Sequence, residues 1–225
     1  MKKIFILVII VPLFSSISEV TANWYSGTQK ADVYGIRAYI SAPSIINIYS
    51  EGESNWVSSY YEDSNGKDWI QTGWRYYSDF IWNPKQYVEY CYNCNSSTPI
   101  YFMDDSFASH IRGTTIHYQI NRTSNNDWCA YTEGYLRYCA QSLHTIPIIG
   151  MAKSEIHGSS YNSLDTIYDV VEYLDPATNS WKILEYPQIW QKDFPYDIKI
   201  YNLSYFRTYR MDTTEIYFPL IQKLN

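Results

Sequence analysis

A seven-residue run at 69–75, WIQTGWR, holds the side chains best suited to chemistry in this chain. The two-residue period of a strand places Trp69, Gln71, Gly73 and Arg75 on one face. A Gln next to a Gly on such a face lies where a ligand can approach the backbone closely. Its NH2 group keeps its protons near neutral pH, so Gln71 could stabilise an oxyanion by hydrogen bonding. The same amide could instead satisfy a neighbouring backbone group within a sheet.

A second candidate is the segment GMAKSEIHG at 150–158. Strand alternation puts Met151, Lys153, Glu155 and His157 on one face. A Glu beside a Lys and a His in a groove can act as a tuned general base that activates water. The alternative is a solvated strand face with mixed charges, which would have no chemical role.

Other common catalytic patterns are missing from the sequence. It contains no H-E-x-x-H, no G-x-S-x-G and no glycine-rich phosphate loop, and the four histidines lack a spacing that suggests a metal cluster. We therefore expect no metal and no cofactor. Carboxylate and amide chemistry remains.

The chain has four cysteines, an even number that favours disulfides in an exported protein and allows three pairings. We favour the two local pairs, Cys91–Cys94 and Cys129–Cys139. A four-thiolate zinc site is the alternative, but only the C-x2-C half has a spacing that suits zinc.

The N-terminus has the three zones of a secretory signal. Lys2 and Lys3 precede an apolar run at 4–13, and small residues follow at 20–22. The run is too short for a bilayer, which needs about 20 residues. We predict a cleaved signal peptide at 1–22 and a secreted or periplasmic location, with an uncleaved anchor as the alternative.

Short stretches rich in Tyr, Ile, Val, Trp and Thr recur along the chain, separated by Gly, Pro, Asn, Asp and Ser. This pattern predicts many strands, as in a sandwich or a barrel, and little helix. We expect one domain at 23–225, with a first strand at 33–40. Further strands are expected at 55–61, 68–76, 86–92, 114–121, 128–138, 146–157, 168–174, 180–186, 198–203 and 215–218.

Aromatic residues dominate the composition, with 25 Tyr and 8 Trp, and the formal net charge is −6. Large amphipathic rings suit half-buried sheets and also line substrate grooves. An acidic chain without a cluster of Lys and Arg is a poor match for a phosphate backbone, so nucleic acid is not an expected partner.

Two stretches resemble known peptidases. Trp56 followed fifteen residues later by Gln71 in IQTG resembles the glutamic peptidases of the eqolisin type, and QTGW is also similar to the E-x-G-W of neprosins. The stretch 87–90, YVEY, is similar to the aromatic–Glu–aromatic stretch that follows in eqolisins. Glu155 falls where both families place a catalytic Glu, although 151–154, MAKS, replaces their acidic–Trp pair.

The resemblance implies an all-β, antiparallel double-sheet sandwich of the concanavalin type that hydrolyses peptide bonds at acid pH. Glu155 would be the general base and Gln71 the oxyanion stabiliser. The implied substrate contacts are Trp56, Trp69, Trp74 and Glu89. Activity would require the Glu155 carboxylate, and His157 or Glu89 are the candidates for a limit on the alkaline side.

Two other functions remain open. In a carbohydrate-binding or carbohydrate-cleaving sandwich, Trp and Tyr rings would stack on sugars, Glu89 and Glu155 would form an acid–base pair, and Gln71 would have no special role. The excess of Tyr also suits a surface-interaction protein without catalysis. A groove that holds both Gln71 and Glu155 would favour the peptidase.

Overall fold

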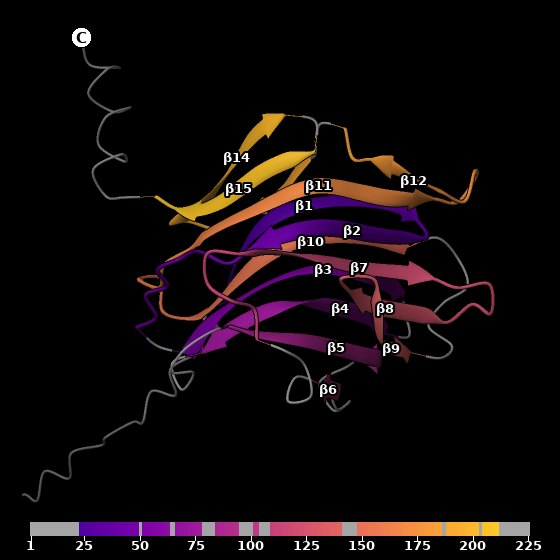
Figure 1. The fold of residues 1–225 in the computed structure, drawn as a ribbon, viewed down its shortest axis with the longest axis horizontal. Coiled ribbons are helices and arrows are strands. Elements are labelled where there is room, and N and C mark those ends of the chain that lie inside the picture. Colours follow the sequence, from indigo (N-terminus) through magenta and orange to yellow (C-terminus); the bar gives the residue numbers. More distant parts are fainter. Residues whose placement is uncertain are drawn as a thin grey trace, which may run out of the picture.

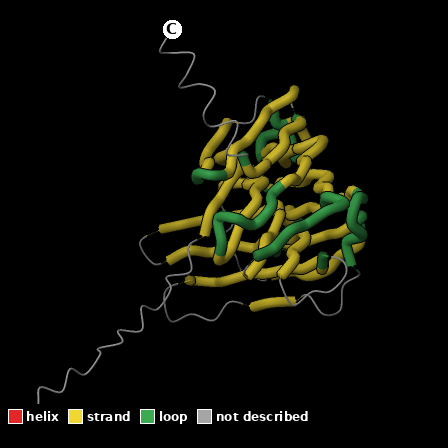
Figure 2. The backbone as a smooth tube through the Cα atoms, turned by 90° about the vertical axis from the view of Figure 1, so that its left-hand side faces the viewer, coloured by secondary structure: helices red, strands yellow, loops and turns green. Residues whose placement is uncertain are grey.

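The computed structural model consists of strands and loops in the part of the chain that it describes (Figures 1 and 2). That part comprises residues 23–49, 51–63, 66–77, 84–94, 101–103, 109–140, 148–185, 188–202 and 204–211. It holds no helix that is long and apolar enough to span a membrane. The predicted signal peptide at 1–22 and the predicted strand at 215–218 lie outside the described residues.

One layer is a seven-stranded sheet with the order β13-β1-β10-β3-β4-β5-β6. All of its pairs are antiparallel, and Figure 1 shows β1, β10, β3, β4, β5 and β6 following one another down the view. Its strands are β1 (Asn23–Val33), β3 (Glu51–Asp63), β4 (Gly66–Tyr77), β5 (Lys85–Cys94), β6 (Tyr101–Met103), β10 (Ile148–Gly158) and β13 (Gln188–Lys192).

The second layer is an eight-stranded antiparallel sheet with the order β14-β15-β11-β2-β7-β8-β9, in which β12 pairs with β11. Its strands are β2 (Gly35–Ser41), β7 (Thr115–Arg122), β8 (Trp128–Thr132), β9 (Tyr135–Ala140), β11 (Asp165–Asp175), β12 (Ser180–Ile183), β14 (Tyr196–Asn202) and β15 (Tyr205–Arg210). The predicted all-β double-sheet sandwich is therefore confirmed.

The sequence pattern misplaced several strands. The predicted first strand at 33–40 spans a break, because β1 ends at Val33 and β2 begins at Gly35. The predicted strand at 128–138 is a hairpin, since Glu133 and Gly134 adopt positive φ angles of 51° and 77°, as in a two-residue turn. Strands β1, β6, β13 and β15 were missed. β1, NWYSGTQKADV, is polar along much of its length and so lacks the apolar signal of a strand.

Apolar side chains from both sheets form the core between the layers. Its largest fully buried members are Trp74, Trp128, Tyr118, Tyr168 and Phe206. Tyr168 and Phe206 stack with ring centroids 4.6 Å apart. Each buried side chain of this size contributes roughly 2–3 kcal/mol by leaving water. The core thus holds the seven-stranded sheet from behind and leaves its other face open.

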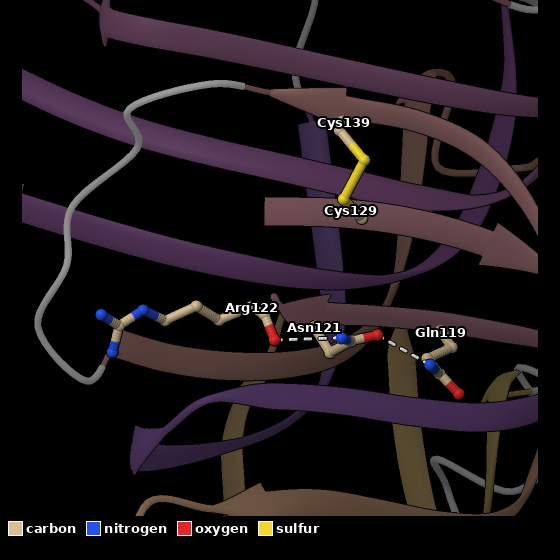
Figure 3. Close-up of a disulfide and its surroundings, with 5 residues drawn as sticks. All are labelled: Gln119, Asn121, Arg122, Cys129 and Cys139. Atoms are coloured by element: carbon tan, nitrogen blue, oxygen red, sulfur yellow. Dashed lines mark hydrogen bonds between the residues drawn. A yellow bond between two sulfur atoms is a disulfide. The ribbon is translucent and has the colours of Figure 1, made fainter. Parts of the chain in front are cut away.

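Both predicted cysteine pairs are joined in the structure. Cys91 pairs with Cys94 within β5, and Cys129 pairs with Cys139. The second pair lies directly across the β8–β9 hairpin, next to β7 (Figure 3). On β7, the same view shows Gln119 donating to Asn121 and Asn121 donating to the carbonyl of Arg122.

A cluster of buried polar groups ties the two sheets together behind β3 and β10. The Ser154 hydroxyl bonds to Asn55 Oδ1 and lies 2.7 Å from the Thr208 hydroxyl and 3.3 Å from Tyr168 Oη. Tyr168 Oη in turn donates to the carbonyl of Lys153. These bonds are directional, so they stabilise one alignment of β10 against β3 and of the two sheets against each other.

Glu53 lies at the edge of this cluster and is fully buried. Its Oε1 accepts a hydrogen bond of 3.0 Å from Asn55 Nδ2, while Oε2 has no hydrogen-bond partner among the described residues. Burial raises the pKa of Glu53 to about 8, against an opposing contribution from Asn55. The folded protein therefore holds a proton that the unfolded chain releases near pH 4.5.

This burial predicts that Glu53→Gln stabilises the protein at neutral and mildly alkaline pH. Because the folded-state pKa is raised, the wild type loses stability relative to the variant as pH rises through the window from about 4.5 to 8. We expect a difference in unfolding free energy of roughly 4 kcal/mol at pH 8 that vanishes below pH 4. Urea unfolding at pH 4, 6 and 8 measures it, with the exposed Glu185→Gln as control. An equal difference at all three pH values would contradict the burial effect.

Candidate active site

The open face of the seven-stranded sheet carries a groove of about 760 Å³. Alternate residues of β1, β3, β4, β5 and β10 line it, together with Gln191 of β13. On β10 these are Ile149 and the four residues of the face that strand alternation predicted, Met151, Lys153, Glu155 and His157. The two candidate segments, about 80 residues apart in sequence, therefore open into one groove.

Gln71 and Glu89 face each other directly across the β4–β5 pair. The same cross-strand row continues through Ser58 of β3 to Met151 of β10. Gln71 Nε2 donates to Glu89 Oε2 at 3.1 Å and to Tyr87 Oη at 3.3 Å. Both amide protons of Gln71 are thus engaged on the β5 side of the groove.

Glu155 occupies a different row, opposite Tyr25 of β1 and Ser54 of β3, which in turn pairs with Arg75 of β4. Glu155 Oε1 accepts hydrogen bonds from Tyr25 Oη at 2.8 Å and from Asn23 Nδ2 at 3.2 Å. His157 Nε2 lies 3.8 Å from the same oxygen. The Glu155 carboxylate is therefore held by two donors from β1, and His157 of its own strand lies nearby.

The row between these two joins Lys153 to Trp56, Gly73 and Tyr87, with Gly27 on the β1 side. A Cβ at Gly73 would lie 1.9 Å from a backbone oxygen of β3, and one at Gly27 would lie 2.6 Å from Lys153 Cγ. These glycines allow close packing against the Trp56 backbone and the Lys153 stem. On a flat sheet, the two rows that flank this one would be roughly 13 Å apart along the strands.

Three of the four predicted substrate contacts line the groove, and one does not. Trp56 is 5% exposed and lines the groove, and Trp69 and Glu89 also line it. Trp74 does not: it is fully buried in the core, and its Nε1 donates to the carbonyl of Ser41 at 3.1 Å. The prediction for Trp74 is wrong because its neighbours Gly73 and Arg75 face the groove, so alternation turns Trp74 inward.

Burial and mutual charge change the protonation of this groove. Burial, followed by the negative charge of Glu155, raises the pKa of Glu89 to about 8, while Gln71 and Arg75 oppose the rise. Burial lowers the pKa of Lys153 to about 7, although Glu155 and Asp193 favour its charged form. The groove therefore favours neutral forms of both an acid and a base.

Several groove residues escaped the sequence prediction. Tyr25 lies on the missed strand β1, and Tyr87 was noted only as part of an aromatic pair around Glu89. Burial and the charges of Glu89 and Glu155 raise the pKa of the Tyr87 phenol well above its usual range. Tyr87 is also hydrogen-bonded to Ser54. Only the register, which brings β1 and β5 to opposite sides of β10, β3 and β4, assembles these groups.

Among the described residues, no group of three or more His, Cys, Asp and Glu side chains could hold a metal ion.

Solved structures with a similar fold include two glutamic peptidases. Scytalido-glutamic peptidase, with a transition-state analogue inhibitor, superposes with a TM-score of 0.62 at 13% identity, over 85% of this chain and 100% of that one. SCP-B, an eqolisin-family peptidase in complex with the tripeptide Ala-Ile-His, gives a TM-score of 0.57 at 12% identity over the same shares. The chain has the glutamic-peptidase fold.

A β-glucanase from Bacillus licheniformis matches more loosely, with a TM-score of 0.42 at 13% identity over 85% of this chain and 79% of that one. No protein-family model and no curated protein sequence matches the chain. The likeness to the glutamic-peptidase fold is thus one of architecture, and the groove residues themselves must supply the evidence for activity.

The lowered pKa of Lys153 predicts an amine that is reactive near neutral pH. Acetic anhydride acetylates only neutral amines and does not itself titrate, so the modification rate of Lys153 should level off above about pH 8, since its amine is then already neutral. The rate for N-acetyl-lysine amide in the same tube should still rise towards pH 10, because an ordinary amine titrates near 10.4. Peptide mass spectrometry follows both. A Lys153 rate that keeps rising in parallel with the model amine would contradict the lowered pKa.

Proposed function

We propose that the chain is an exported, acid-acting endopeptidase of the glutamic type, with Glu155 as general base and Gln71 as oxyanion stabiliser. The observation that carries this proposal is the shared groove: both side chains open into one cavity of a sheet that has the glutamic-peptidase fold. A polypeptide is the substrate class, in keeping with the peptide and the transition-state analogue bound to the two similar peptidases.

In the proposed reaction, the Glu155 carboxylate takes a proton from a water molecule, whose oxygen attacks the carbonyl carbon of the peptide bond. The carbonyl oxygen becomes an oxyanion, which the Gln71 NH2 group stabilises by donating a hydrogen bond. When the C–N bond breaks, Glu155 returns the proton to the leaving amine. One water is consumed, and both side chains end in their starting states.

The charge of Glu155 acts on both hydrogen-bond partners of Gln71. Glu155 and Gln71 are two rows apart in the register, yet the charge of Glu155 raises the pKa of both Glu89 and Tyr87. These are the two groups that accept hydrogen bonds from Gln71. Trp56 and Lys153 occupy the row between, so a peptide carbonyl seated over the Trp56 ring would lie between the base and the amide.

Export is supported by the covalent chemistry of the chain. Two disulfides form among the described residues, and disulfides persist in oxidising compartments. The lysine-led apolar start of the sequence is typical of a secretory signal. We infer that residues 23–225 act outside the cytoplasm.

Two substitutions test the mechanism. Gln71→Ala removes the oxyanion donor, and Glu155→Gln removes the base while keeping the shape of the side chain. Each should lower kcat on denatured casein or haemoglobin by at least 100-fold at pH 3–5, with a smaller change in KM. The kcat of the double variant should be only slightly lower than that of the less active single variant, because the two groups act in one step.

The exposed Glu185→Gln serves as the matched control, and thermal unfolding shows whether each variant is folded. A folded parent that cleaves no protein at pH 3, 5 or 7 would overturn the peptidase proposal. Full activity in either folded site variant would remove that residue from the mechanism.

A carbohydrate-cleaving enzyme is the second candidate, favoured by one observation. Glu89 and Glu155 line the same aromatic groove, and their mutual repulsion helps to keep a proton on Glu89, as a general acid requires. In that enzyme Gln71→Ala would only perturb Glu89. Glycan hydrolysis by the parent that survives Gln71→Ala but not Glu89→Gln would favour this function over peptide cleavage.

A further inference from the structure

The Gln71 amide is held in an orientation that opposes its proposed role. An oxyanion stabiliser must direct an N–H into the groove, but both protons of Gln71 Nε2 are donated to Glu89 Oε2 and Tyr87 Oη. An ionised carboxylate accepts hydrogen bonds and donates none. While Glu89 is ionised, it therefore favours keeping the NH2 group turned towards β5.

We propose that Glu89 is a positioning residue whose proton sets the orientation of the Gln71 amide: ionised Glu89 holds the NH2 group on the β5 side, and protonated Glu89 releases it into the groove. The proposal rests on the proposed function for its catalytic meaning. Its structural content, a change in amide orientation with the protonation of Glu89, stands without it.

Both partners of Gln71 can reverse their roles when Glu89 gains a proton. A protonated carboxyl has one O–H donor, which can bond to Gln71 Oε1 instead of accepting from Nε2. The Tyr87 hydroxyl can likewise donate or accept, and burial keeps its proton on the oxygen. With two donors facing it, the amide is favoured in the reversed orientation, with Oε1 on the β5 side and both N–H groups facing the groove.

The surroundings of Glu89 favour its protonated form. Glu89 lies directly opposite Gln71, with Arg75 on the same strand as Gln71, Tyr87 on its own strand, and Glu155 across the groove on β10. The charge of Glu89 also contributes to the raised pKa of Tyr77 on β4. Burial and Glu155 raise the pKa of Glu89 to about 8, against the opposing effects of Gln71 and Arg75.

The ionisation of Glu155 and the protonation of Glu89 favour each other, as the proposed mechanism requires. Two carboxylates in one groove repel each other when both are ionised, so ionisation of Glu155 favours the proton on Glu89. The state with an ionised base is then also the state in which Gln71 is released. Loss of the Glu89 proton at higher pH would reverse the amide and stop the reaction even though the base remains ionised.

The pH profile of kcat tests this directly, with its shape rather than its height as the readout. The parent should lose at least 10-fold in kcat between pH 6 and pH 9. Glu89→Gln cannot ionise and can still donate to Gln71 Oε1, so its profile should change less than 3-fold over that range. Lys153→Met is the matched control, because Lys153 also titrates in this region. A fall in kcat between pH 6 and pH 9 that persists in Glu89→Gln and disappears in Lys153→Met would overturn the proposal.

A second measurement does not depend on activity. In protein labelled with 15N-glutamine and 13C-glutamate, the Gln71 side-chain signals, assigned by their loss in Gln71→Ala, should shift with pH. The midpoint of this shift should equal the midpoint at which the Glu89 carboxyl 13C signal titrates. That shift should be absent in Glu89→Gln. Gln71 signals that do not change at the Glu89 midpoint would refute the proposed change in amide orientation.

The two readouts also separate the two proposals. A shared midpoint in a folded protein that cleaves no peptide would sustain the switch and overturn the peptidase. Peptide cleavage with an unchanged alkaline limb in Glu89→Gln would do the reverse.

Discussion

The register of β10, β3, β4 and β5 is the constraint on which the rest of the structure depends. In this register Lys153, Trp56, Gly73 and Tyr87 share one row, with the rows of Glu155 and Gln71 on either side. A slip of one residue would turn every groove side chain into the core and every core side chain into the groove. The hydrogen bonds around Ser154, behind the sheet, stabilise the alignment that prevents such a slip.

Strand alternation was the part of the site that could be predicted from the sequence. It placed Gln71 and Arg75 on one face and Lys153, Glu155 and His157 on another, and the structure brings both faces into one groove. Trp74 shows the limit of reasoning by residue type. An exposed Trp and a core Trp look alike in composition, and its position between Gly73 and Arg75 was the evidence against a place in the groove.

What the sequence could not supply was the pairing of strands distant along the chain. Tyr25 reaches Glu155 because β1 pairs with β10, more than 120 residues later, and β1 carries too few apolar residues to be recognised as a strand. The burial of Glu53 was equally hidden. Glu53 lies on β3 between Gly52 and Ser54, and it turns inward because Ser54 and Trp56 face the groove.

Desolvation connects the core to the groove. Glu53 on the inner face and Glu89 on the outer face of the same sheet both have a raised pKa because charge is costly where water is scarce. Lys153, which shares the groove, is shifted towards its neutral form for the same reason. A groove that excludes water enough to protonate Glu89 also strengthens any hydrogen bond made to an oxyanion within it. The burial that holds a proton on Glu89 therefore favours the same chemistry that the released Gln71 amide would perform, and both depend on the sheet remaining closely packed around Trp56.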